Sequence, residues 1–90
     1  MITYTIKVYD GSDISKRLKC VATKSNLTKE KTYSLAEQIA ERISDVYDRS
    51  YVAIFEEYPT ENGVHLELYD TITGPYNPNI NPNFKDLLED

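Results

Sequence analysis

Apolar and polar side chains alternate along the first nine residues, which is the pattern of a strand with one buried face. One side carries Ile2, Tyr4, Ile6 and Val8, and the other carries Thr3, Thr5, Lys7 and Tyr9. Residues 10–13 suit a turn, because glycine reaches positive φ at little cost and aspartate bonds to nearby backbone amides. A second strand is expected from Arg17 to Thr23. Its inward residues are Leu18, Cys20 and Ala22, and the hairpin has a basic rim.

The spacing of the apolar residues then changes from every second residue to the three- and four-residue steps of a helix. Residues 25–32 form a polar connector, and Ser34-Leu35-Ala36-Glu37 matches the capping box that begins many helices. We expect the helix to end near Arg49. Its apolar stripe consists of Leu35, Ala36, Ile39, Ala40, Ile43, Val46 and Tyr47. The opposite side carries a ridge of four carboxylates: Glu37, Glu41, Asp45 and Asp48.

A second hairpin follows the helix. We expect a strand from Tyr51 to Tyr58, a five-residue loop over 59–63 with left-handed Asn62 and Gly63, and a strand from Val64 to Tyr69. In the last strand Val64, Leu66 and Leu68 are expected to face the core, and His65, Glu67 and Tyr69 to be exposed. For the third strand, the sequence does not determine which side faces the helix. Either Val52 with Ile54 or Ala53 with Phe55 faces the helix.

The last 17 residues differ in composition from the rest. Three of the four prolines lie between residues 75 and 82, where they remove backbone donors and favour extended conformations. We therefore divide the chain into a single α+β domain, residues 1–73, and an Asn/Pro-rich C-terminal arm, residues 74–90. Asn81 and Pro82 suit the start of a short helical turn that presents Phe84, Leu87 and Leu88.

These elements predict an α+β fold in which one helix joins two β-hairpins, in the order ββαββ. The helix packs on one face of a four-stranded, mainly antiparallel sheet, and the extended C-terminal arm wraps an edge or the other face. The face without the helix must be polar, covered by the arm, or paired with another molecule. Dimerisation through that face is one of these outcomes.

Composition and charge narrow the function. Ninety residues with 40% hydrophobic side chains suit one small domain, and a net charge of −5 argues against direct binding of nucleic acid through phosphates. Residues 1–31 carry seven basic and three acidic side chains, whereas residues 32–90 carry three basic and twelve acidic ones. We expect a cytoplasmic protein, because the sequence contains neither a signal peptide nor an apolar run long enough to span a membrane.

Residues that could carry catalysis are few. His65 lies two positions from Glu67 and could act as a general base, although an exposed histidine on a sheet is far commoner. One histidine and one cysteine cannot form a zinc site, and Cys20 fits the core as a small apolar side chain. The sequence therefore predicts a protein that is not an enzyme and has no cofactor and no bound metal.

Two features favour protein binding. The helix ridge together with Glu56, Glu57 and Glu61 could contact a basic partner, since four carboxylates at helical pitch span about 16 Å, as several phosphates of a DNA strand do. We predict this partner-binding set to be Glu37, Glu41, Asp45, Asp48, Glu56, Glu57 and Glu61. Eight tyrosines are the second feature, because tyrosine is enriched at interfaces. A further candidate interface is formed by Tyr9, Tyr69, Phe84, Leu87 and Leu88.

The leading hypothesis is a non-catalytic acidic protein that inhibits or modulates a nuclease or another basic nucleic-acid-binding protein, as a mimic of DNA. In size and charge, though in no quotable motif, the chain resembles the anti-CRISPR and antirestriction inhibitors of phages and mobile elements, and this resemblance of class implies such a partner. The alternative is a self-assembling structural or accessory protein that forms a homodimer through the open sheet face or the arm. A third hypothesis is a small enzyme or ligand carrier that uses His65 and the tyrosines of the sheet.

Overall fold

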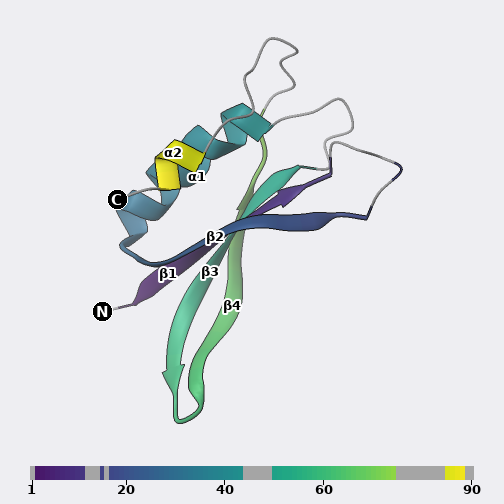
Figure 1. The fold of residues 1–90 in the computed structure, drawn as a ribbon. Helices are drawn as coiled ribbons and strands as arrows, with labels where there is room; N and C mark the ends of the chain where they lie inside the picture. Colours follow the sequence, from purple (N-terminus) through teal and green to yellow (C-terminus); the bar gives the residue numbers. More distant parts are fainter. Residues whose placement is uncertain (1, 12–14, 16, 44–49, 75–84, 89–90) are drawn as a thin grey trace.

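The computed structural model describes residues 2–11, 15, 17–43, 50–74 and 85–88. They form β1 (Thr3–Asp10), β2 (Lys19–Leu27), α1 (Lys29–Ile43), β3 (Tyr51–Thr60), β4 (Gly63–Ile72) and α2 (Lys85–Leu88). The four strands make one sheet in the order β2-β1-β3-β4, and every neighbouring pair is antiparallel. One long helix, α1, lies on one face of this sheet (Figure 1). The predicted ββαββ fold is confirmed.

The core lies between α1 and the two central strands. The β1–β3 ladder keeps its register through seven pairs, and its apolar residues on one face meet the stripe of α1. Val52 and Ile54 face the helix, which resolves the phase that the sequence left open. The buried apolar residues of this cluster are Tyr4, Ile6, Val8, Leu27, Leu35, Ala36, Ile39, Ala40, Val52 and Ile54.

The helix begins six residues before the predicted start, so the interpretation of Ser34 as its cap is wrong. The hydroxyl of Thr28 accepts a hydrogen bond from the Lys31 amide at 3.3 Å, and its carbonyl accepts one from the Thr32 amide at 2.9 Å. Asn26, with φ of +62°, lies within β2 at an irregularity between the pairs Ile6–Lys24 and Tyr4–Leu27, two residues before this cap. Ser34 lies inside the helix, where its hydroxyl accepts a bond from Gln38 instead. The predicted helix residues 44–49 lie outside the described residues.

The pairing of β2 with β1 is irregular, and two of the three side chains predicted to point inward from β2 do not do so. Val8 pairs with Ala22 but Tyr9 pairs with Cys20, so β2 carries one extra residue between the two pairs. Such a bulge reverses the side on which the following side chains lie. Cys20 consequently shares the face of Tyr9 and is exposed, as is Leu18, and neither lies in the core. Ala22 does pack against the core.

A bulge in β4 has a larger effect. Ile54 pairs with Asp70 and Phe55 with Leu68, so Tyr69 is the extra residue. Ile72 packs against the core, and without the bulge the alternation would place every second residue back to Val64 on the same side. The bulge turns the three apolar side chains predicted to face the core onto the opposite face. These are Val64, Leu66 and Leu68.

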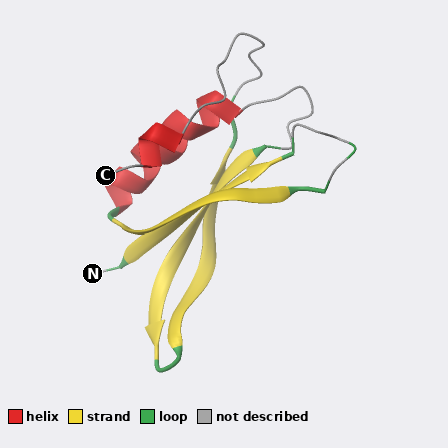
Figure 2. Cartoon of the chain, in the orientation of Figure 1, coloured by secondary structure: helices red, strands yellow, loops and turns green. Residues whose placement is uncertain are grey.

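The β3–β4 hairpin is longer and tighter than expected, and it extends well past the end of the helix (Figure 2). Pro59 pairs with Val64 and Thr60 with Gly63, so a two-residue turn replaces the predicted five-residue loop. Gly63, with φ of +129°, takes the conformation open mainly to glycine, and Asn62 does not have a positive φ. Both faces of this projecting part lie beyond the cover of α1.

The end of the chain docks on its own fold. Leu87 and Leu88 of α2 pack against the core cluster, and the ammonium of Lys24 donates a 2.8 Å hydrogen bond to the Leu88 carbonyl. Arg42 of α1 forms an ion pair with Asp86 at 3.1 Å. Asn81, Pro82 and Phe84 of the predicted helical turn lie outside the described residues.

Candidate protein-binding surfaces

The two faces of the sheet present different chemistry once the bulges are taken into account. On the side that carries α1, the sheet beyond the helix exposes tyrosines and carboxylates. On the opposite side, which we call the open face, it exposes mainly apolar and aromatic residues. The fold therefore offers two separate surfaces, with the sheet between them.

Tyr69 marks the start of the acidic surface on the helix side. Its ring meets the buried ring of Tyr4 edge to face, with 5.6 Å between centroids. The Lys29 ammonium lies 5.5 Å from the centroid of the Tyr69 ring, close enough for a cation–π interaction. A hydrogen bond to Tyr69 is the largest cause that raises the pKa of Lys29. The exposed face of this ring thus already holds a basic side chain.

Tyr33 connects this surface to the helix. Its hydroxyl donates a 2.8 Å hydrogen bond to the Asp70 carboxylate of β4. Desolvation, followed by this hydrogen bond, raises the pKa of Tyr33 to about 12. Glu37 and Glu41 follow Tyr33 at successive steps of four residues and are exposed on the helix. The described half of the predicted helix ridge therefore begins beside the Tyr33–Asp70 contact.

The projecting hairpin continues the surface away from the helix. Glu56 pairs with Glu67, and Tyr58 pairs with His65, which brings these four side chains onto the helix side of the hairpin. The imidazole Nε2 of His65 lies 3.4 Å from a carboxylate oxygen of Glu67, and both side chains are exposed. Desolvation and a hydrogen bond to Glu56 raise the pKa of Tyr58. The residues from 51 to 72 contain five carboxylates and no lysine or arginine.

We call this combined surface the acidic belt. It consists of Glu37, Glu41, Glu56, Glu67 and Asp70 together with the rings of Tyr33, Tyr58 and Tyr69.

Glu57 does not belong to this belt, although the sequence grouped it with Glu56. Adjacent strand residues point to opposite faces, so Glu57 lies on the open face. Its carboxylate accepts hydrogen bonds from the hydroxyls of Thr3 and Thr5, at 3.0 and 2.8 Å, and from the Asn26 amide at 2.8 Å. Burial raises the pKa of Glu57, but these three bonds outweigh it and hold the pKa below its ordinary value. Glu57 is thereby bound within its own fold.

The other members of the predicted partner-binding set are placed as follows. Glu61 lies exposed in the turn at the hairpin tip. Asp45 and Asp48 lie outside the described residues. Glu37 and Glu41 are thus exposed on α1, Glu56 lies on the helix side of the hairpin, Glu61 lies at the hairpin tip, and Glu57 lies on the opposite face.

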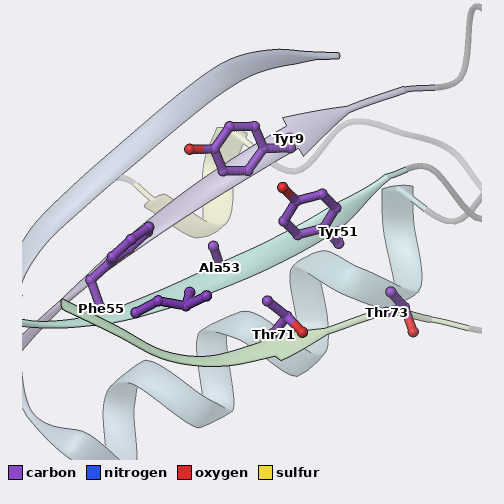
Figure 3. A pocket seen from close by; sticks show the side chains of 7 residues that line it. Tyr9, Tyr51, Ala53, Phe55, Thr71 and Thr73 are labelled. Carbon is purple, nitrogen blue, oxygen red and sulfur yellow. The ribbon is translucent and has the colours of Figure 1, made fainter.

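The open face contains a hollow of about 310 Å³ (Figure 3). The rings of Tyr9 and Tyr51 stack along one side of it, with 5.0 Å between centroids and 20° between ring planes. The Lys7 ammonium lies 5.3 Å from the centroid of the Phe55 ring. The lining residues are Tyr9, Tyr51, Ala53, Phe55, Leu68, Thr71 and Thr73.

The residues of the predicted apolar interface do not form one surface. Tyr9 lies on the open face, whereas the bulge turns Tyr69 to the helix side. Leu87 and Leu88 are partly buried against the core. Sequence reasoning missed the roles of Phe55 and Leu68 in the hollow. For Phe55 the phase of β3 was left open. The alternation of β4 groups Leu68 with Val64 and Leu66 on one face, but the bulge that turns this face away from the core leaves no mark in a pattern of period two.

Two other features that could indicate a function are a metal site and a helix that crosses a membrane. Among the described residues, no three side chains of His, Cys, Asp or Glu are grouped so as to hold a metal ion. Within the same part of the chain, neither helix combines the length and apolar character needed to cross a membrane. Comparison with known proteins finds no match among family models, curated proteins or solved structures.

Proposed function

We propose that this chain is a non-catalytic binding protein that holds a lysine- or arginine-rich segment of a partner protein on its acidic belt. The observation that carries the proposal is the alternation of carboxylates and tyrosine rings on the helix side of the projecting hairpin. A carboxylate offers ionic hydrogen bonds to a guanidinium, and a tyrosine ring beside it offers a cation–π face. Both kinds of group recognise the same basic side chains.

The contact between Lys29 and Tyr69 supports this proposal within the molecule. The Lys29 ammonium lies over the Tyr69 ring, and the bulge in β4 turns that ring to the belt side. A guanidinium from a partner would meet equivalent chemistry at Tyr58, whose hydroxyl is bonded to Glu56. The hairpin projects past the helix, so these groups could enter a concave basic surface.

Basic surfaces of this kind are the ones with which proteins hold nucleic-acid phosphates. We therefore propose that the partner is a nuclease or another nucleic-acid-binding protein, and that the belt inhibits or modulates it by occupying its phosphate-binding surface. The exposed thiol of Cys20 supports a reducing compartment such as the cytoplasm.

The chemical part of the proposal can be tested with a fluorescent peptide of nine arginines as the probe. Wild-type protein should bind the peptide, and the affinity should fall as salt is raised from about 50 to 200 mM, because exposed charges are screened. Glu67→Lys should weaken binding by about threefold to tenfold, because it places a cation in the centre of the belt.

Glu30→Lys is the matched control. Glu30 is exposed in the first turn of α1, outside the belt, and its reversal changes the net charge by the same amount. This variant should bind the peptide nearly as tightly as the wild type. Equal losses in the two variants would show that net charge alone attracts the peptide, and the proposed site would be wrong.

The biological part requires the natural partner. Tagged wild-type protein and Glu67→Lys would each be used to capture proteins from lysate of the source organism. A nucleic-acid-binding protein retained by the wild type alone should release its DNA or RNA when the wild type is added. If the captured protein keeps its nucleic acid, the belt does not act at a phosphate-binding surface.

A further inference from the structure

The open face has a hollow at one end and protruding apolar side chains at the other. Leu68 and Val64 are 63% and 59% exposed, which is high for apolar residues within a strand. The hollow lies toward the start of β3, and Leu66 and Val64 lie toward the hairpin tip. On the open face, three successive pairs follow one another at steps of two residues along β3: Ala53 with Thr71, Phe55 with Leu68, and Glu57 with Leu66.

We propose that the open face packs against the open face of a second copy of this chain. The two-fold axis would lie between the sheets and cross the strands at the row of Phe55 and Leu68. The open face is complementary to itself in shape and in charge, and its size suits such an interface.

Shape complementarity follows from the equal spacing along β3 on the two sides of that row, which β4 matches through the extra residue Tyr69. The pair of Ala53 and Thr71, in the hollow, lies two residues from Phe55 in one direction, and Glu57 with Leu66 lies two residues away in the other. A two-fold axis across the strands superposes these two positions. Leu66 of each copy, and Val64 beyond it, would therefore lie over the hollow of the other.

The charges of the face obey the same symmetry. On the described parts of β1, β3 and β4, the open face carries one cation, Lys7, and one anion, Glu57. Lys7 pairs with Ala53, and Glu57 pairs with Thr3, so the two charges lie on opposite sides of the proposed axis. The symmetry brings Lys7 of each copy toward Glu57 of the other. A chain with a net charge of −5 thus has a face of zero net charge on which two copies can meet.

The size of the face also suits a dimer. The 37 residues of the four strands, at about 3.4 Å of length each and about 4.8 Å between strands, give a flat area of roughly 600 Å². Protruding side chains increase the surface that is buried above this flat value. A standard stable interface buries about 800 Å² on each partner.

The first test is the mass of the full chain by light scattering over a range of concentrations. The expected result is a transition from 10.4 kDa to twice that mass. Leu68→Gln should weaken dimerisation by about tenfold or more, because it replaces an apolar side chain at the centre of the interface. Its melting temperature should stay within a few degrees of wild type, because exposed positions contribute little to stability.

Ile2→Gln is the matched control. Ile2 is also exposed, but it precedes β1 in the phase of Tyr4, on the helix side. This variant should dimerise like the wild type. A chain that stays monomeric at about millimolar concentration and high salt, or a Leu68→Gln variant that dimerises as tightly as wild type, would overturn the proposal.

Cross-linking tests the symmetry itself. In a Cys20→Ser background, Val64→Cys and Thr73→Cys introduce two thiols at opposite ends of the face. Nine residues of extended chain separate them by roughly 30 Å within one copy, too far for an internal disulfide. Mild oxidation should therefore give a covalent dimer, and Val64→Cys alone should give much less. Equal yields would show that the copies do not meet in this arrangement.

This inference does not depend on the proposed function, because the acidic belt lies on the other side of the sheet. The two interactions also respond to salt in opposite ways. Added salt weakens the attraction between the belt and a basic peptide, but it screens the repulsion between two chains of charge −5 and so should strengthen the dimer. Failure of one can therefore be recognised apart from failure of the other.

Discussion

The ring of Tyr69 stands edge-on against the ring of Tyr4, at 66° between ring planes. Tyr4 belongs to β1 and Tyr69 to β4, two strands that are not neighbours in the sheet. The contact forms across β3 because the bulge turns Tyr69 toward the helix side. It joins the edge strand of the acidic belt to the buried core, where Tyr4 lies.

Tyr69→Ala should lower the free energy of unfolding by about 1–2 kcal/mol, because it removes both the aromatic pair and the ring beneath Lys29. Tyr69→Phe keeps the ring and should stay within about 0.5 kcal/mol of wild type. Urea denaturation of the three proteins measures the difference. Equal losses in both variants would assign the effect to the hydroxyl rather than to the ring.

The protonation of the Glu57 carboxylate makes the stability of the fold depend on pH. Its pKa in the folded protein lies below its ordinary value, so its contribution is fully present above about pH 4.3, the ordinary glutamate pKa. The contribution is lost as the pH falls through the folded pKa, because the protonated carboxyl binds the three donors less well. The difference in melting temperature between wild type and Glu57→Gln should therefore be largest at pH 7 and smaller at about pH 3, below the ordinary glutamate pKa.

Glu67→Gln serves as the control for this experiment. Glu67 is exposed on the other face and has no comparable set of donors. Its melting temperature should follow that of wild type at both pH values. A gap between wild type and Glu57→Gln that is as large at pH 3 as at pH 7 would contradict the assignment.

Tyr33 should dominate the alkaline end of the titration. Its pKa of about 12 exceeds the ordinary tyrosine value, so the folded state holds the proton more tightly than the unfolded state does. The resulting stability is present below about pH 10 and is lost as the pH rises toward 12. Tyr33→Phe should remove the last phase of the ultraviolet titration of the phenols. If that phase remains, another tyrosine carries it.

Gly74 should tolerate no side chain. A Cβ placed there would lie 2.3 Å from the carbonyl oxygen of Ala40 in α1, closer than real Cβ contacts. Gly74→Ala should therefore cost about 1–3 kcal/mol, since the helix backbone cannot yield as a side chain does. Differential scanning calorimetry would show this as a fall in melting temperature of several degrees or more. An unchanged value would mean that the chain moves away from α1 at no cost.

Gly63→Ala provides a comparison of a different kind. A Cβ at Gly63 meets no atom within 4 Å, so any cost must come from its φ of +129°. Such backbone strain costs about 1–3 kcal/mol in a residue with a side chain.

The elements were predictable from the sequence because each has a strong local pattern. The alternation from Ile2 to Tyr9 and the stripe from Leu35 to Ala40 depend only on which residues face a core. Those patterns led to the ββαββ order, which the structure confirms. The predicted start of the helix was wrong because Ser34-Leu35-Ala36-Glu37 and Thr28 are both suitable caps in sequence, and the hydrogen bonds of the folded chain form at Thr28.

The faces of the edge strands were not predictable in the same way. Extra residues in β2, near Val21 and near Asn26, and one in β4, at Tyr69, change the side on which the following side chains lie. Backbone hydrogen bonding to a neighbouring strand determines where such a residue lies. The predicted grouping of Glu56 with Glu57 failed for a simpler reason, since neighbours in a strand point apart. The candidate carboxylates were therefore predicted as one set. Their division between the two faces of the sheet could be assigned only once the strand pairing was known.

The bulges have a consequence for how far association can proceed. β2 and β4 are the two edges of the sheet, and both contain an irregularity in their pairing. A regular, flat edge would accept further strands from other molecules and propagate into fibrils, whereas a bulged and twisted edge does not match an incoming strand. Lateral polymerisation through added strands is thus disfavoured at both margins of the sheet.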